Sequence, residues 1–201
     1  MKPQLLIREL NSESLIAYYT ELARAIYPIK IIIYNMPMYS GVNIDYEAVK
    51  VLAKLPNIVG IKDSAGTKAQ IQDLHEACPD LDIYCGSASN YLNARQAGAI
   101  GGIMAFNNVG VDLMRGIDQL ARTDLPKAEK LQADVAKVNK VITADYGVPG
   151  LKYMMAKDGY HSITVRYPLM PLTPEQKSKV SEAKNWLEIY RRNAKEVLRE
   201  L

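Results

Sequence analysis

From about residue 12 to residue 106, segments with apolar residues at helical spacing alternate with short segments that are apolar throughout. Four short, continuous apolar runs rich in β-branched residues predict strands buried on both faces, at 29–35, 57–62, 81–86 and 100–106. The segments around them place apolar residues at helical spacing, which predicts helices over 12–26, 44–55, 67–78 and 87–99. The first helix is expected to begin at Ser12 or Ser14, because serine side chains cap helix N-termini.

The alternation of strand and helix, with strands that are apolar throughout, is typical of parallel βα units. No further strand is predicted after residue 106, and four helices are expected, over 111–122, 125–143, 148–159 and 174–201. The last predicted helix carries an apolar side made of Val180, Ala183, Trp186, Leu187, Tyr190 and Leu198. From periodicity alone the fold class is α/β with a helical C-terminal region. A doubly wound sheet and a half-complete barrel both remain open.

The chain lacks the phosphate-binding motifs of a nucleotide-binding protein, which excludes that class. A doubly wound fold of that class carries a glycine-rich phosphate loop after its first strand. The segment "GSASNYLNARQAG" (86–98) contains neither GxGxxG nor GxxxxGK[ST].

Charge and composition exclude further classes. The chain has 25 basic and 22 acidic residues, a net charge of +3, and no dense basic block, so we expect no nucleic-acid partner. Its apolar runs are shorter than a membrane span, and the N-terminal apolar patch is too short for a signal peptide. We therefore expect a soluble, cytoplasmic protein with no membrane partner.

The cysteines and histidines do not predict a metal site. Cys78 and Cys85 lack metal-ligand spacing and are expected to be buried free thiols. His75 and His161 each stand alone, and a surface or capping role is expected for both.

Candidate chemistry lies where two of the predicted strands end. Tyr34 closes "IKIIIYN" and Lys62 closes "NIVGIK", and the C-terminal ends of parallel strands form the functional face of such folds. A partly desolvated lysine has a lowered pKa, and its neutral amine can form a Schiff base with a ketone. A phenol on the next strand can relay the protons. The alternatives are a Lys62 that reaches solvent and forms a salt bridge with Asp63 or with a helix, and a Tyr34 that is an ordinary packed aromatic.

Two segments carry a resemblance to a known family. "IIIYNMPMYSG" (31–41) contains a YNxP motif, and "NIVGIKDSAG" (57–66) contains G-[IVL]-K-[DEQ]-x-x-G, with Lys62 following Tyr34 by 28 residues. Both motifs and their separation resemble those of the dihydrodipicolinate synthase / N-acetylneuraminate lyase superfamily of class I aldolases. The segments 84–106, 147–155 and 165–180 are similar to later parts of the same family.

The resemblance implies a lyase, an aldolase or dehydratase that acts on pyruvate-derived 2-keto acids without metal or organic cofactor. Lys62 would form the Schiff base, and Tyr34 would donate or accept the proton beside it. Ile103 falls where the family places a backbone contact to the pyruvyl group, while its side chain is expected to be a plain core residue. The resemblance also implies a homo-oligomer.

Two positions at which this chain departs from the family narrow the choice of substrate. Dihydrodipicolinate synthases have an arginine for the second substrate two residues after the YNxP proline, and this chain has Tyr39 there. Sialic-acid lyases have an acidic pair where this chain has Ala88 and Ser89. A 2-keto-3-deoxy sugar acid, or another small 2-keto acid, is therefore the expected substrate.

The family's barrel has eight strands in about 250 residues, so the resemblance implies a partial (β/α)8 TIM barrel. Residues 1–108 would form its C-terminal half, about strands 5 to 8. Residues 109–201 would form the last barrel helix and a C-terminal helical region. The first four strands would precede residue 1, as in a truncated chain, and Arg8 falls near the position of a second relay tyrosine.

The uncovered barrel interior and open sheet edges of such a chain would favour association with itself or with a partner. Loss of the carboxylate-binding turn on the missing strands makes the activity of the chain doubtful. The competing hypothesis is a catalytically inactive homologue, or an assembly module built on the helical tail.

Overall fold

The computed structural model describes residues 10–65, 67–160 and 162–199, with side chains as far as residue 196. The chain divides into two compact units, one that ends at Ile103 and one that begins at Met104. Each unit is built from its own elements and has its own core, and each is described by itself.

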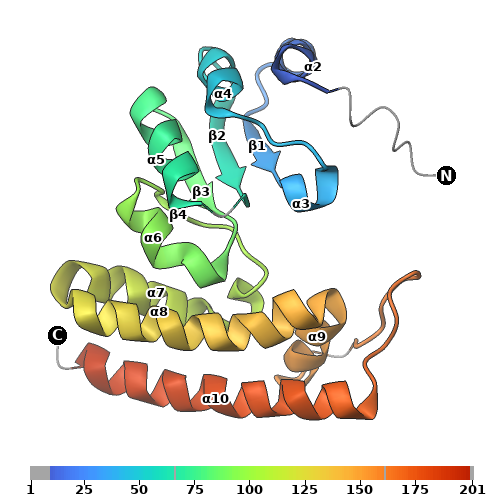
Figure 1. The fold of residues 1–201 in the computed structure, drawn as a ribbon, viewed down its shortest axis with the longest axis vertical. Coiled ribbons are helices and arrows are strands. Elements are labelled where there is room, and N and C mark those ends of the chain that lie inside the picture. The colour runs from blue at the N-terminus through green and yellow to red at the C-terminus, as the bar shows by residue number, and fades with distance from the viewer. Residues whose placement is uncertain (1–9, 66, 161, 200–201) are drawn as a thin grey trace. The chain divides into compact units, whose positions relative to one another are not determined.

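The first unit alternates helices and strands (Figure 1). Its elements are α2 (Ser12–Ala25), β1 (Ile31–Asn35), α3 (Pro37–Ser40), α4 (Tyr46–Leu52), β2 (Ile58–Asp63), α5 (Lys68–Ala77), β3 (Asp82–Cys85), η1 (Ala88–Asn90), α6 (Tyr91–Gln96) and β4 (Gly101–Gly102). The strands form a parallel sheet in the order β1-β2-β3-β4. The predicted α/β class with a parallel sheet is confirmed.

The two faces of this sheet differ in burial, which corrects the expectation of strands buried on both faces. Along β1, Ile33 is 1% exposed, whereas Ile32 is 45% exposed. The buried face lies under α4 and α5 (Figure 1) and continues into Ile61 and Ile83 of the next strands. Continuous β-branched runs had predicted two covered faces, but apolar residues on the second face are left partly exposed.

Element ends differ from the predicted ones where local hydrogen bonding decides them. Helix α2 is capped by Asn11, whose side chain accepts a hydrogen bond from the Ser14 amide at 2.9 Å, and not by Ser12 or Ser14. The fourth strand, expected over 100–106, is limited to Gly101–Gly102, the two residues that are Cα partners of β3. Ile100 and Ile103 on either side of it each donate one further main-chain hydrogen bond to β3. The helix expected over 87–99 divides into η1 and α6.

The second unit is helical. It contains α7 (Asn107–Thr123), α8 (Leu125–Asn139), the π-helical turn η2 (Lys140–Asp145), α9 (Gly147–Ala156) and α10 (Pro174–Arg199). The predicted apolar side of α10 is buried at Val180, Ala183 and Leu187, each 0% exposed. Trp186 and Tyr190 are only partly buried, and the side chain of Leu198 lies outside the described residues.

Ionic contacts hold α10 to α7. The guanidinium of Arg191, 22% exposed, donates to Asp112 Oδ2 at 2.9 Å and to Glu188 Oε1 at 2.7 Å, and it also donates to the Val109 carbonyl. Lys184 binds both Glu188 and Asp158. The hydrogen bond from Lys184 is the main cause of a lowered pKa of Glu188, which its partial desolvation opposes.

Among the residues that the structure describes, no helix combines the length and the apolar character needed to cross a membrane.

Close approach of two strands explains one motif glycine. A Cβ added to Gly60 on β2 would lie 2.8 Å from the carbonyl oxygen of Asp82 and 3.2 Å from its Cβ, both on β3. The same Cβ would come within 3.5 Å of the ring of Tyr84. Gly101 flanks the other side of Tyr84, but a Cβ there would meet the ring at 3.9 Å, an ordinary contact. Gly60 is therefore required for the pairing of β2 with β3, and Gly101 is not.

Replacing Gly60 by alanine is expected to lower the free energy of unfolding by about 1–3 kcal/mol, because the new methyl group must push backbone atoms apart. Gly101→Ala is the matched control and should be near neutral, since alanine also restricts the unfolded chain. Urea unfolding of both variants measures the difference. Equal losses at the two positions would contradict the packing account.

Arg191→Ala is expected to lower the free energy of unfolding by about 1–2 kcal/mol, because it removes the donor that Asp112 and the Val109 carbonyl of α7 share with α10. The adjacent Arg192 is exposed, so Arg192→Ala should change the same quantity by less than about 0.5 kcal/mol. Thermal unfolding monitored by circular dichroism compares the two, and an equally large effect of Arg192→Ala would refute the assignment.

Candidate functional site

The two predicted site residues meet on the sheet. Tyr34 and Lys62 are Cα partners in the parallel pairing of β1 with β2. Lys62 Nζ lies over the Tyr34 ring, 3.8 Å from its centroid, in a cation–π contact. Such a contact contributes about 0.5–2 kcal/mol, more where water is excluded. The structure therefore brings together the amine and the phenol that the sequence placed on separate strands.

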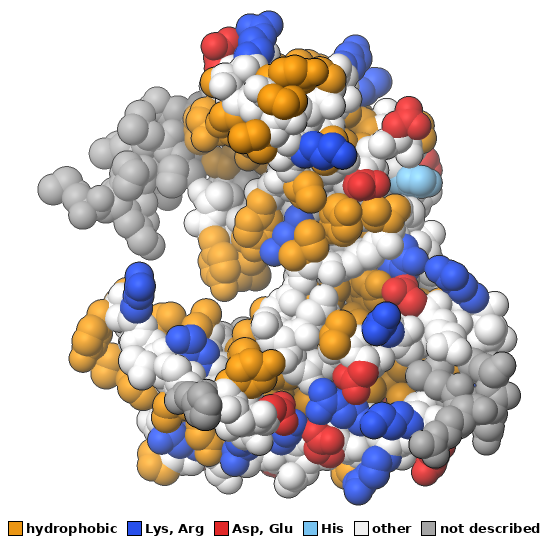
Figure 2. Space-filling view, turned by 180° about the vertical axis from the view of Figure 1, so that it is seen from behind, with side chains coloured by type: hydrophobic (Ala, Val, Ile, Leu, Met, Phe, Trp, Pro, Cys, Tyr) orange, Lys and Arg blue, Asp and Glu red, His pale blue; other side chains and the backbone are white. Residues whose placement is uncertain are grey.

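Both residues lie on the uncovered face of the sheet. Tyr34 is 52% exposed and Lys62 is half-buried, and neighbouring Ile32 and Ile103 are 45% and 43% exposed. Figure 2 shows the molecule from behind, with hydrophobic side chains gathered over the sheet on this side. The amine thus stands on an apolar surface that a small molecule can reach.

Tyr84 is a residue of this face that the sequence analysis missed. It is the Cα partner of Lys62 on β3, so Tyr34 and Tyr84 flank the lysine on its two neighbouring strands. Its hydroxyl lies 3.5 Å from Asp82 Oδ2. Partial burial, and then the charge of Asp82, raise the pKa of the Tyr84 phenol. Its position at the centre of "DIYC", two residues after Asp82, places it on the exposed face by strand alternation, a signal that was available from the sequence.

Asp63 does not pair with Lys62 as the alternative interpretation supposed. It is 1% exposed and lies on the helix-covered face, where its Oδ1 accepts hydrogen bonds from the side chains of Asn35 and Gln70. Successive residues of a strand point to opposite faces, so Lys62 and Asp63 cannot meet. Cys85 is also buried on the covered face, and burial raises the pKa of its thiol.

Ile103 follows β4 directly. Its amide donates to the Cys85 carbonyl at 2.9 Å, which extends the strand pairing by one bond. Its side chain is 43% exposed, so it is not the core residue that we expected. Its backbone lies two positions beyond Gly101, the Cα partner of Tyr84, and so close in register to the row that contains Lys62.

Of the remaining positions named from the sequence, some lie among the described residues and some do not. Tyr39 on α3 is 80% exposed, Ala88 is buried and Ser89 is exposed. His75 is exposed in the last turn of α5. Three further positions, Arg8, Gly66 and His161, lie outside the described residues.

The chemistry of the site is that of an amine and phenols. Lysine can attack a carbonyl carbon, and a tyrosine hydroxyl can pass protons to and from the adduct. Within the described part of the chain, no three His, Cys, Asp or Glu side chains are grouped so as to hold a metal ion.

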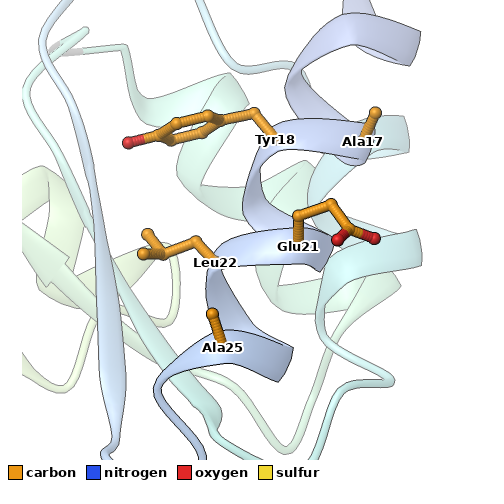
Figure 3. A pocket seen from close by; sticks show the side chains of 5 residues that line it. All are labelled: Ala17, Tyr18, Glu21, Leu22 and Ala25. Atoms are coloured by element: carbon orange, nitrogen blue, oxygen red, sulfur yellow. The ribbon is translucent and has the colours of Figure 1, made fainter.

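A shallow hollow along α2 lies away from these residues. It is lined by Ala17, Tyr18, Glu21, Leu22 and Ala25 (Figure 3), all from one helix. Its only charged group, Glu21, forms an ion pair with Arg24 at 3.1 Å. The hollow offers no amine or other nucleophile, so we place the candidate site at Lys62.

Comparison with curated proteins finds relatives of this chain among the 4-hydroxy-tetrahydrodipicolinate synthases. The chain is 31% identical over 174 residues to the 4-hydroxy-tetrahydrodipicolinate synthase of Caldicellulosiruptor saccharolyticus, which covers 86% of this chain and 59% of that protein. It is 33% identical over 172 residues to the enzyme of the same name from Listeria welshimeri, covering 85% of this chain and 58% of the relative. The chain thus spans less than two thirds of the length of these relatives.

Solved structures show the same fold. The 4-hydroxy-tetrahydrodipicolinate synthase of Methylacidiphilum fumariolicum superposes with a TM-score of 0.85 at 24% identity, over 94% of this chain and 64% of that one. A dihydrodipicolinate synthase from Acinetobacter baumannii, solved in complex with pyruvate, gives a TM-score of 0.82 at 25% identity, over 90% of this chain and 63% of that one. The model of the dihydrodipicolinate synthetase family matches residues 8–185. The chain therefore belongs to the dihydrodipicolinate synthetase family.

Proposed function

We propose that Lys62 is the nucleophile of a class I aldolase-type lyase, which condenses with the ketone of pyruvate or of a pyruvate-derived 2-keto acid. The observation that carries the proposal is the position of Lys62 Nζ, 3.8 Å from the ring centroid of Tyr34 on a face open to small molecules. Family membership and a relative solved in complex with pyruvate support it.

The reaction begins when the Lys62 ammonium gives up a proton to water and the resulting amine adds to the carbonyl carbon, which gives a carbinolamine. Loss of water from that adduct gives an iminium ion, and its positive nitrogen draws electrons from the neighbouring carbon–carbon or carbon–oxygen bond. Tyr34 donates the proton that turns the carbinolamine hydroxyl into water, and recovers one when the imine is hydrolysed. Ile103 would contact the pyruvyl group through its backbone. These steps involve only the substrate, water and groups of this chain.

A 2-keto-3-deoxy sugar acid is the substrate that we propose within this class. Tyr39 occupies the position of the arginine that, in the family, guides a second carboxylate. Its 80% exposed side chain on α3 offers a hydroxyl and no positive charge. A polyhydroxylated substrate matches such a group better than a dicarboxylate does.

The proposal includes the finer architecture. The sheet of the first unit would be about strands 5 to 8 of a (β/α)8 barrel, with residues 1–108 as the barrel part and 109–201 as the last barrel helix and helical region. Coverage of 64% of a solved relative at a TM-score of 0.85 supports this assignment. A cytoplasmic location belongs to the same proposal.

Incubation with pyruvate and borohydride is expected to add one reduced pyruvyl group to Lys62, since reduction traps the iminium as a stable secondary amine. Lys62→Arg should abolish the adduct, and Tyr34→Phe should slow its formation by about tenfold or more, the range of a lost acid–base group. Lys54, exposed at the end of α4, supplies the control Lys54→Arg, which should leave the adduct unchanged. Peptide mass spectrometry locates the modification.

Absence of an adduct in the folded, unmodified chain would refute the nucleophilic role. The catalytically inactive homologue, or assembly module, would then be the better description of the protein.

Self-association is a further part of the proposal: we expect the exposed face of the sheet to bind a second copy of this chain. Ile32, two residues before Tyr34 on β1, is 45% exposed, and burial of such an apolar side chain against a second copy, beside Lys62 and not over it, stabilises association. Sedimentation velocity at micromolar concentration should show a dimer or larger species. Ile32→Lys should shift the population toward monomer, and exposed Val51→Lys on α4 is the control. A monodisperse monomer of the unmodified chain would contradict the proposal.

A further inference from the structure

Each of the two candidate residues is followed in the chain by a buried polar residue. Asn35 follows Tyr34 and is 0% exposed, and Asp63 follows Lys62 and is 1% exposed. The two are Cα partners, like the residues before them. On the covered face of the sheet, Asn35 Nδ2 donates to Asp63 Oδ1 at 2.7 Å. The pair on the open face is therefore backed by a hydrogen-bonded pair on the covered face.

Two further side chains complete a cluster that we call the polar clamp: Asn35, Asn43, Asp63 and Gln70. Asn35 Nδ2 also donates to Asn43 Oδ1 at 2.9 Å, and Gln70 Nε2 donates to Asp63 Oδ1 at 3.0 Å. The Asn35 side-chain oxygen accepts from the Ile44 amide at 3.1 Å. The polar clamp thus joins β1, β2, α5 and the segment between α3 and α4.

The polar clamp fixes the register of the two strands more strictly than apolar packing can. A slip of one residue would carry Asn35 or Asp63 to the opposite face and expose apolar side chains in exchange. A partial slip would leave a buried carboxylate without its donors, which costs several kcal/mol in proteins. Main-chain bonds continue beyond the clamp: the Ser64 amide donates to the Asn35 carbonyl at 2.9 Å, and the Gly86 amide donates to the Asp63 carbonyl at 2.7 Å.

We propose that the polar clamp is a positioning device, through which Asn35 and Asp63 hold the Tyr34 phenol against the Lys62 amine. Neither residue touches the reacting groups, because both point to the other face of the sheet. The proposal deepens the assigned role of Lys62 and rests on it, since it names the residues that keep the nucleophile and its proton relay in reach of each other. Proton relay requires this closeness, because a displacement of about 1 Å can cost a hundredfold in rate.

The test follows the Lys62–Tyr34 contact itself, without substrate. A CH2 group beside an ammonium that lies over an aromatic ring is shifted upfield by the ring current. Lysine labelled with 13C at Cε therefore gives a displaced resonance for Lys62, assigned by its loss in Lys62→Arg. Lys157 and Lys177 lie farther from a ring, with Nζ 5.2 Å and 5.9 Å from the Tyr153 centroid, and should be displaced less. Spectra are recorded for the full chain and for Asn35→Ala, Asp63→Ala and Asp63→Asn.

Asn57→Ala is the matched control. Asn57 is 4% exposed, precedes β2 at its opposite end, and donates to the carbonyls of Ala23 at 2.9 Å and Ile29 at 3.1 Å. Asn57→Ala therefore removes a buried side-chain amide with a similar number of hydrogen bonds from the same unit. This amide lies at the other end of β2 from Lys62. Any effect of general destabilisation should appear in this variant as well.

Asn35→Ala and Asp63→Ala are expected to lose at least half of the upfield shift and to form the pyruvate adduct at least tenfold more slowly. Asp63→Asn should keep both within about twofold, because its side-chain oxygen still accepts from Asn35 and Gln70. Asn57→Ala should leave both unchanged. The proposal is overturned if the alanine variants at 35 and 63 match the unmodified chain, or if Asn57→Ala reduces shift and rate as much as they do.

A milder variant covers the case in which the alanine variants do not fold. Gln70 is half-buried on α5, so Gln70→Ala removes one donor to Asp63 and should reduce the adduct rate by about threefold, with a smaller change of the Lys62 shift. An unchanged shift and rate in that variant would count against the clamp. An unmodified chain that shows the shift but forms no adduct refutes the proposed function alone, since the positions of the two side chains are tested without pyruvate.

Discussion

The parallel pairing of β1 with β2 is the constraint on which the candidate site depends. It sets Tyr34 opposite Lys62 on one face and Asn35 opposite Asp63 on the other. Because side chains alternate along a strand, one register decides both pairs at once. The open face receives an amine over a phenol ring, and the covered face receives an amide bonded to a carboxylate. Chemistry and stability therefore draw on the same four positions.

The difference between the two faces of the sheet has a functional meaning. A nucleophile buried under α4 and α5 could not meet a substrate, whereas one on the open face stands on apolar surface within reach of a small molecule. The polar residues that would be costly to bury alone, Asn35 and Asp63, are placed where Asn35 Nδ2 donates a hydrogen bond to Asp63 Oδ1. The same arrangement leaves Ile32 exposed beside the site, and for this reason we expect a second copy to cover Ile32 while Lys62 and Tyr34 stay open to substrate.

Much of the fold could be predicted from the sequence because its signals are local. Three strands and most helices fall within a few residues of the predicted spans. The misses have physical causes. Continuous isoleucines in β1 do not distinguish a strand covered on two faces from one covered on a single face. Apolar residues 103–106 look like strand, but pairing with β3 ends at Gly102.

The site was predictable only in part. Lys62 and Tyr34 could be named from strand ends and motifs, but their contact depends on a register that no single-sequence pattern supplies. The pairing of Asn35 with Asp63 and the place of Tyr84 follow from that register and were missed. The most direct test of the account is the nuclear Overhauser effect between the Tyr34 ring protons and the Lys62 ε-methylene protons in the folded chain. A strong cross-peak is predicted, and its absence from a spectrum in which both resonances are assigned would contradict the account.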